Sequence, residues 1–154
     1  MKYILPLLVL ATPVFAQGTD LPIQDERLDV PACLIAVNGL PASYRGQLYD
    51  ACTNIPANLC LVRGTPETCL HETAARIVSF YQEHRAELPE EIKGSTLAQR
   101  SYKTAVRRIG ENLDNDVTCQ TTDTELKALC VFETRSEAIK SFFRQTRRAG
   151  VTLK

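Results

Sequence analysis

The sequence predicts a small all-α domain: a disulfide-stapled bundle of helical hairpins with about four to five helices. Three observations support this fold class. Apolar residues recur at helical spacing along most of the chain, no alternating strand pattern of useful length appears, and six cysteines occur in only 154 residues. This length favours one domain with a modest core, which disulfides would supplement.

Residues 1–16 have the features of a secretory signal peptide. Lys2 supplies the positive charge, residues 3–15 are almost entirely apolar, and the small Ala16 precedes the expected cleavage site at Gln17. The apolar run is too short to span a bilayer comfortably. We therefore expect a periplasmic or secreted protein with no membrane span, and with no lipid anchor because no cysteine follows the cleavage site.

Beyond the signal peptide, we expect a flexible leader over residues 17–28, one helical domain over 29–150 and a short tail over 151–154. The leader is polar and contains a proline. The domain opens with a short helix over residues 29–38, which Gly39 can end.

A second helix is expected over residues 42–61. Proline at position 56 predicts a kink or a break near its end. The helical spacing places four residues on one stripe of this helix: Tyr44, Leu48, Cys52 and Ile55.

A long helix is expected over residues 66–88, limited by a proline at position 89. Thr65 supplies a capping hydroxyl, Pro66 suits the first helical position, and Glu67 lies near the positive end of the helix dipole. Steps of four, three, four and seven residues define its buried face: Leu70, Ala74, Ile77, Tyr81 and Leu88.

Two more helices complete the prediction. One opens at Gly94-Ser95, weakens near Gly110 and buries Ala98, Tyr102, Ala105 and Ile109. A loop over residues 113–121 follows, and the segment 122–125 is a capping box. The final helix can be capped by Gly150 and places four apolar residues at helical spacing: Leu129, Phe132, Ile139 and Phe143.

In an oxidising compartment the even number of cysteines indicates a disulfide framework. Six cysteines allow 15 pairings. Pairs that flank predicted bends are favoured, namely Cys33–Cys52, Cys60–Cys69 and Cys119–Cys130. Each would contribute roughly 2–4 kcal/mol to stability. The metal alternative, Cys60 and Cys69 with His71, matches no zinc spacing, so we expect no metal and no cofactor.

The charge balance is even, with 18 basic and 18 acidic residues, and becomes −1 when Lys2 is removed with the signal peptide. This balance argues against broad nucleic-acid binding. The segment from Ile139 onward is basic, with Lys140, Arg144, Arg147, Arg148 and Lys154. It could touch anionic lipid, a cell-wall polymer or an acidic protein, but cations stabilising a helix C-terminus are the favoured interpretation.

Catalytic patterns are sparse, and we expect no enzyme. His71 and His84 lie on one predicted helix but about 20 Å apart, so they cannot share a metal. No nucleophile-elbow motif is present. Glu72 has only a short match to the helical glutamate of transglycosylases, and the neighbouring Glu90 and Glu91 point apart.

The segment from Cys60 to Tyr81 resembles the N-terminal domain of LprI-type lysozyme inhibitors. The shared pattern is a cysteine, a Thr-led helix start, a second cysteine and an amphipathic helix ending in an aromatic residue. It continues with Leu97-Ala-Gln-Arg-Ser-Tyr102, the loop Cys119 and Cys130-Val-Phe-Glu-Thr-Arg135, and covers roughly residues 52–148. The resemblance implies an exported all-helical domain and, as its activity, lysozyme inhibition.

Together these features predict an exported, non-enzymatic binding protein of the cell envelope. Its expected partner is a lysozyme or another envelope protein. A structural or stress-related envelope protein, or a cell-wall hydrolase, are the alternatives.

For binding, stapled loops are the expected contact surface, because pinning a loop lowers its ordering cost. Arg63 in the 61–65 turn can pair with a carboxylate, although it could simply interact with solvent. The second candidate is the 113–121 loop, which carries Asp114, Asn115 and Asp116 beside Cys119.

Overall fold

The computed structural model describes residues 25–115 and 117–153. In this part the chain forms no strand, which confirms the all-α prediction. Its helices are the 3₁₀-helix η1 (Glu26–Leu28), α1 (Val30–Asn38), α2 (Ala42–Leu61), α3 (Pro66–His84), the 3₁₀-helix η2 (Arg85–Glu87), α4 (Thr96–Asp114) and α5 (Thr124–Arg148). No helix of the described residues is long and apolar enough to cross a membrane. The predicted signal peptide lies outside them.

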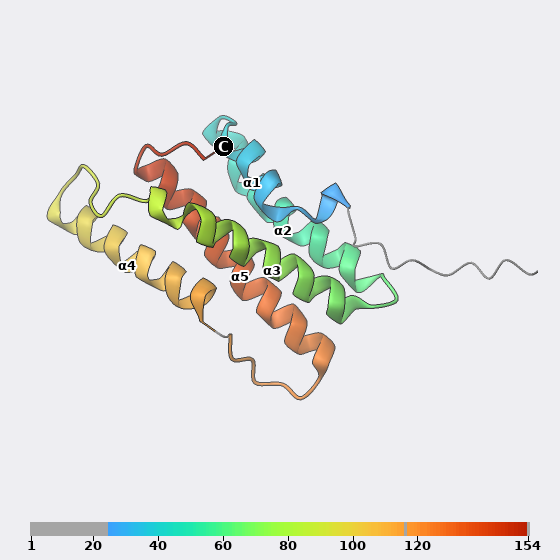
Figure 1. Ribbon diagram of the computed structural model, residues 1–154. Helices are drawn as coiled ribbons and strands as arrows, with labels where there is room; N and C mark the ends of the chain where they lie inside the picture. The colour runs from blue at the N-terminus through green and yellow to red at the C-terminus, as the bar shows by residue number, and fades with distance from the viewer. Residues whose placement is uncertain (1–24, 116, 154) are drawn as a thin grey trace, which may run out of the picture.

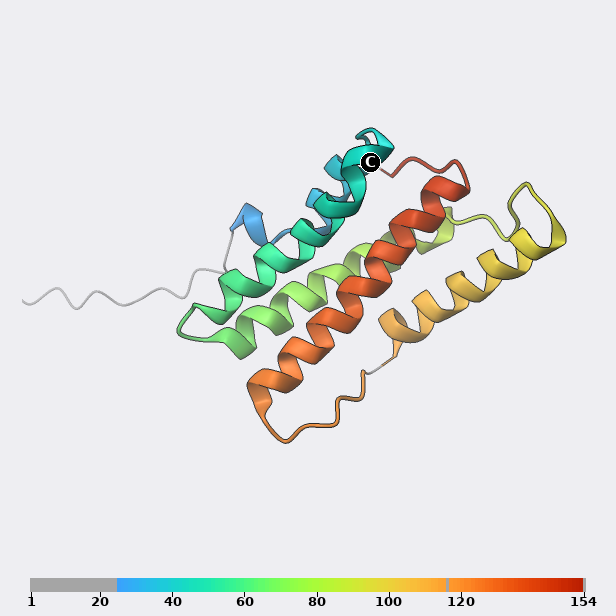
Figure 2. The same ribbon diagram turned by 180° about the vertical axis from the view of Figure 1, so that it is seen from behind.

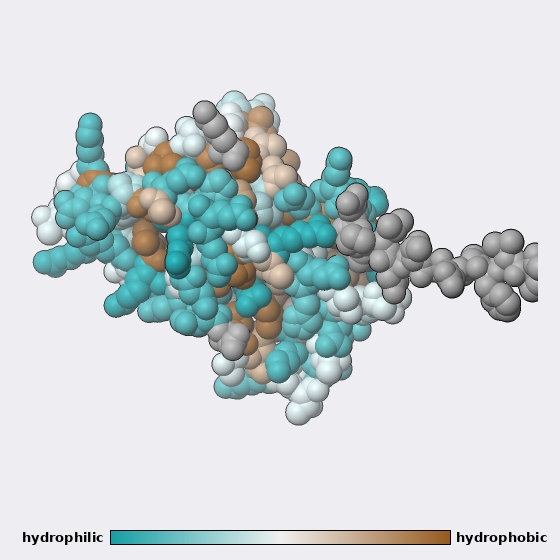
Figure 3. All heavy atoms as spheres, viewed as in Figure 1, coloured by the Kyte–Doolittle hydropathy of each residue, from teal (hydrophilic) through white to brown (hydrophobic). Residues whose placement is uncertain are grey.

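Helices α3 and α5 form the centre of the bundle, where they pack against each other more extensively than any other pair. The α1–α2 hairpin lies along one side of this pair, and α4 lies at the opposite edge beside α5 (Figures 1 and 2). The face seen in Figure 3 is mostly hydrophilic, and hydrophobic residues show through in separate spots.

The core of the bundle is built around aromatic residues of α3 and α5. Tyr81 meets Phe142 edge to face, with 5.5 Å between the ring centroids. Phe80 stacks on Phe143 at 5.6 Å. Phe142 and Phe143 are fully buried, and so is Phe132, the third phenylalanine of α5. Such contacts between α3 and α5 add to the apolar area removed from water.

Side chains cap three of the α-helices in the way their sequences suggest. Asp29 accepts a hydrogen bond from the Ala32 N–H (3.0 Å) and Ser95 accepts one from the Ala98 N–H (3.3 Å). At α5 the cap is Asp123, one residue later than the start of the expected capping box, and it binds the Leu126 N–H at 2.9 Å. These bonds satisfy amide groups that have no partner within a helix.

Two expectations about helix ends need correction. Thr65 occupies the N-cap position of α3, but its hydroxyl makes no capping hydrogen bond. Helix α4 continues past Gly110 to Asp114, so the following loop begins at Asn115 instead of residue 113.

The apolar stripe expected on α2 is wrong, because Tyr44, Leu48 and Ile55 are exposed. The buried residues of α2 are instead Tyr49, Cys52, Thr53, Pro56 and Cys60. Two disulfides fix this orientation, since Cys52 is tied to α1 and Cys60 to α3. The helix also runs through Pro56 without a break.

All three disulfides join the pairs expected from the sequence. The Cα–Cα distances are 5.6 Å for Cys33–Cys52, 5.4 Å for Cys60–Cys69 and 6.3 Å for Cys119–Cys130. The first ties α1 to α2, the second closes the α2–α3 turn, and the third anchors the α4–α5 loop to α5. Three of the four connections between successive α-helices are therefore spanned or anchored by a covalent link, and only the α3–α4 connection at residues 88–95 is not.

The ends of the described chain are more closely packed than expected. The leader was expected to be flexible as far as residue 28, but Glu26–Leu28 form η1 and Leu28 is buried. At the other end, Leu153 of the expected tail is buried as well. Residues 151–153 run from α5 toward α1 (Figures 1 and 2).

Candidate functional site

Arg63, the first expected binding residue, already has an ion-pair partner. Its Nη2 lies 2.9 Å from Oδ2 of Asp25, which also binds Arg27 at 2.8 Å. Hydrogen bonds from Arg27 are the main reason that the pKa of Asp25 falls to about 2, and the charge of Arg63 lowers it further. Arg63 therefore joins the α2–α3 turn to the start of the described chain.

The second expected binding region lies at the end of α4. The Asp114 carboxylate forms an ion pair with Arg85 at 3.2 Å, and Asn115 is the C-cap residue of α4. Asp116 lies outside the described residues. Among the described residues no hydrogen bond or ion pair joins this region to Arg63, so the two loops do not form a single site through direct contacts.

The residues considered for catalysis are dispersed along the α3 surface. His84 Nδ1 lies 2.6 Å from Oε1 of Glu87, and the His84 ring lies 4.3 Å from Phe80. His71 and Glu72 are exposed. Residues 25–115 and 117–153 contain no group of three side chains suited to hold a metal ion.

The basic side chains in the second half of α5 have different partners. Lys140 binds Asp50 and Glu137, Arg148 donates to the Ala98 carbonyl at 3.0 Å, and Arg144 donates to Ser141 at 2.8 Å. The Arg147 side chain makes no hydrogen bond or ion pair with any described residue. It points instead toward a cavity between α1, α2, α5 and the chain end.

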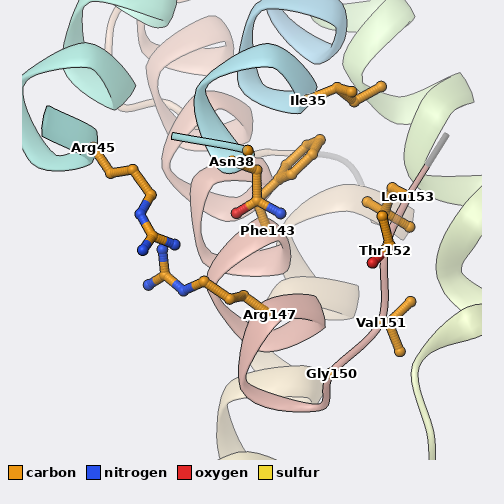
Figure 4. Close-up of a pocket in the computed structure, with 10 residues that line it drawn as sticks. Ile35, Asn38, Arg45, Phe143, Arg147, Gly150, Val151, Thr152 and Leu153 are labelled. Atoms are coloured by element: carbon orange, nitrogen blue, oxygen red, sulfur yellow. The ribbon is translucent and has the colours of Figure 1, made fainter. Parts of the chain in front are cut away.

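This cavity, which we call the arginine pocket, has a volume of about 470 Å³. That volume is within the range of sites for small ligands. Figure 4 shows the pocket, whose lining residues are Ile35, Asn38, Gly39, Arg45, Phe143, Arg147, Gly150, Val151, Thr152 and Leu153.

Two arginines from different helices meet at the arginine pocket. Arg45 in the second turn of α2 and Arg147 in the last turn of α5 point their guanidinium groups toward each other (Figure 4). The Nε of Arg45 is buried and has no hydrogen-bond partner among the described residues. Two like charges held together in this way repel each other, and an anion between them would remove the repulsion.

The carboxylate in the neighbouring depression forms its ion pair with a different cation. Asp50 lines a neighbouring depression together with Arg45, Arg144 and Arg147, but its Oδ1 binds the Lys140 ammonium at 2.9 Å. The surface around the arginine pocket therefore carries excess positive charge.

Opposite the arginines, the arginine pocket has an apolar wall. Phe143 is fully buried, Leu153 is nearly so, and Ile35 and Val151 are half-buried. Asn38 is fixed at the rim, because its Oδ1 accepts a hydrogen bond from the Tyr49 hydroxyl at 2.7 Å. The pocket thus combines a cationic side with an apolar side.

Gly150 is the residue that allows the chain to form this wall. It adopts φ +74, the left-handed region that favours glycine. The N–H groups of Gly150 and Val151 then bind the carbonyls of Arg147 (3.0 Å) and Thr146 (2.8 Å), which completes a Schellman motif. The prediction that Gly150 caps the last helix is confirmed, and the turn directs Leu153 back onto the bundle.

Sequence reasoning missed Arg45 and Arg147 as a pair. The excess of basic residues after Ile139 was visible, but no spacing links it to an arginine in α2. Only the packing of α2 against α5 brings the two guanidinium groups together.

Comparisons with known proteins identify no relative of this chain. No protein-family model, no curated protein and no solved structure matches the chain.

Proposed function

We propose that the protein is an exported, non-enzymatic binding protein of the cell envelope that recognises an anionic group at the arginine pocket. The observation that carries this proposal is the pairing of Arg45 with Arg147, since neither has a carboxylate partner among the described residues. Arginine suits this role because its planar fork can donate two hydrogen bonds to one carboxylate or phosphate.

The disulfides support a binding role in an oxidising compartment. Cys33–Cys52 fixes α1 against α2, and these helices carry Asn38 and Arg45. A preformed site loses little freedom when its ligand binds, so more of the interaction energy contributes to affinity.

Nuclear magnetic resonance tests this proposal on the oxidised chain. Inorganic phosphate should cause saturable shifts of the Arg45 and Arg147 side-chain Nε–H signals, while the signal of exposed Arg100 on α4 stays in place. Equal, non-saturating shifts of all three would contradict a specific anion site.

N-terminal sequencing of the protein from its native host tests export. The sequence of the mature protein should begin near Gln17, and a product beginning at Met1 would contradict export.

Lysozyme inhibition is the more specific function implied by the resemblance to LprI-type proteins. The α2–α3 turn would supply that contact, with Val62 strongly exposed at its tip beside Arg63. A lysozyme activity assay with the parent protein and the Val62→Asp variant tests it. Inhibition that is lost in the variant would support the hypothesis, and no inhibition by the parent would exclude it.

The cell-wall hydrolase alternative makes a different prediction. If hydrolysis occurred, one of His71, His84 or Glu72 would be needed, and its replacement by alanine would lower the rate a hundredfold or more. We expect no cell-wall hydrolysis by the parent.

A further inference from the structure

We infer that the arginine pocket binds an amphipathic anion, with its phosphate or carboxylate head between Arg45 and Arg147 and its alkyl body against the apolar wall. This inference rests on the proposed function and specifies the ligand class. It follows from the position of charge and apolar surface on opposite sides of one cavity.

The head-group position is set by the two guanidinium groups. They come from separate helices, so an anion between them would bridge α2 and α5. The start of α2 also attracts an anion, because Pro41 at its N-cap gives no side-chain hydrogen bond to the first amides of the helix. These amides carry partial positive charge near Ala42, which lines the neighbouring depression with Arg45.

The apolar wall distinguishes this ligand from a simple inorganic anion. Ile35, Phe143 and Val151 belong to three different segments, and each contributes to the lining of the same cavity. A bare phosphate would leave the exposed parts of Ile35 and Val151 in water. An alkyl chain would cover them, and each methylene fully removed from water raises affinity about fourfold.

The size of the cavity limits the ligand to a single short chain. About 470 Å³ is enough for one head group with a medium-length alkyl body. We therefore expect affinity to rise from butyl to octyl chains.

The test is calorimetric titration of the oxidised full chain with four probes below their micellar concentrations: inorganic phosphate, butyl phosphate, octyl phosphate and octanoate. Neutral octyl glucoside is the fifth probe and serves as the control for the head group. Octyl phosphate should bind at least tenfold more tightly than butyl phosphate, and octyl glucoside should bind at least tenfold more weakly than octyl phosphate. Comparison of octanoate with octyl phosphate distinguishes a carboxylate from a phosphate source.

Variants locate the site. The double variant Arg45→Gln/Arg147→Gln should weaken octyl phosphate binding at least tenfold, whereas Arg100→Gln, which removes an exposed guanidinium from α4, should leave it unchanged. Thermal unfolding of each variant, followed by circular dichroism, confirms that the fold is retained.

The contrary results separate failure of the amphipathic ligand from failure of anion binding itself. Equal affinity for inorganic phosphate and octyl phosphate, with dependence on both arginines, would overturn the amphipathic ligand but retain anion binding. Unchanged binding by the double variant would place the site elsewhere and overturn both proposals. Failure of every probe to bind would also overturn both.

Discussion

The Lys140 ammonium on α5 lies 2.9 Å from the Asp50 carboxylate on α2, and it also binds Glu137. The Lys140 side chain is only 6% exposed, whereas those of Asp50 and Glu137 are 65% and 66% exposed. The buried cation is therefore held by two carboxylates that remain largely in water. This asymmetry determines what each replacement should cost.

Removal of the lysine should be far milder than removal of its partners. Lys140→Met fills the same space and leaves two solvated carboxylates, so stability should change by about 1 kcal/mol or less. The double variant Asp50→Ala/Glu137→Ala leaves the buried ammonium without these two partners and should lower the free energy of unfolding by about 2 kcal/mol or more. Urea unfolding at pH 7 measures both changes in stability.

Lys103→Met is the control, because it breaks an exposed ion pair with Glu91. It should change stability by less than about 1 kcal/mol. Equal losses for Lys140→Met and the double variant would contradict this account.

The protein should lose stability at alkaline pH. Burial alone would lower the pKa of Lys140, but its hydrogen bonds with Glu137 and Asp50 raise it above the ordinary value of 10.5. Burial also raises the pKa values of Tyr81 and Tyr102 above 10.0. A group with a raised pKa in the folded state stabilises the fold below its unfolded pKa, and that contribution is lost as pH rises through the folded value. The melting temperature should therefore be nearly constant from pH 8 to about pH 9.5 and fall above pH 10. A melting temperature that rises above pH 10 would show the opposite linkage.

Two glycine replacements should shift stability in opposite directions. Gly150→Ala forces an alanine into φ +74 and should cost roughly 1 kcal/mol, although an added Cβ would meet no atom within 4 Å. Gly46→Ala, within α2 and equally open, should stabilise the protein by about 0.5–1 kcal/mol. Chemical denaturation distinguishes the two. A stabilising Gly150→Ala would mean that the left-handed turn is not required.

Loss of the Cys119–Cys130 bridge should be costly and partly local. Cys119→Ser/Cys130→Ala opens the covalent loop between α4 and α5 and should lower stability by about 2–4 kcal/mol. Hydrogen exchange should accelerate most at residues 117–123 and in the first turn of α5. Uniform acceleration across all helices, with no local excess, would show that this bridge does not anchor the loop.

Much of the fold could be predicted because its signals are local. Caps such as Ser95, helix stops such as Gly150 and apolar periodicity all act over a few residues. The disulfide pairs could be predicted for the same reason, since each joins cysteines on either side of a predicted bend.

The inward face of α2 could not be chosen from sequence periodicity. This helix has apolar residues on both faces: Tyr44, Leu48 and Ile55 are exposed, while Tyr49 and Pro56 are buried. Only the packing of α2 against the other helices, together with two disulfides, selects one face. The candidate site has the same origin, because Arg45 and Arg147 meet through tertiary packing. The salt bridge from Arg63 to Asp25 could not be predicted either, since Asp25 falls in a segment expected to be a flexible leader.

The order of the disulfides has a consequence for how the chain matures. Each bond joins one cysteine to the next along the chain: the first to the second, the third to the fourth and the fifth to the sixth. In a chain that emerges into an oxidising compartment with its N-terminus first, each cysteine meets its correct partner before any later thiol arrives. An oxidant catalyst should therefore be sufficient for native pairing, and a disulfide isomerase should be dispensable.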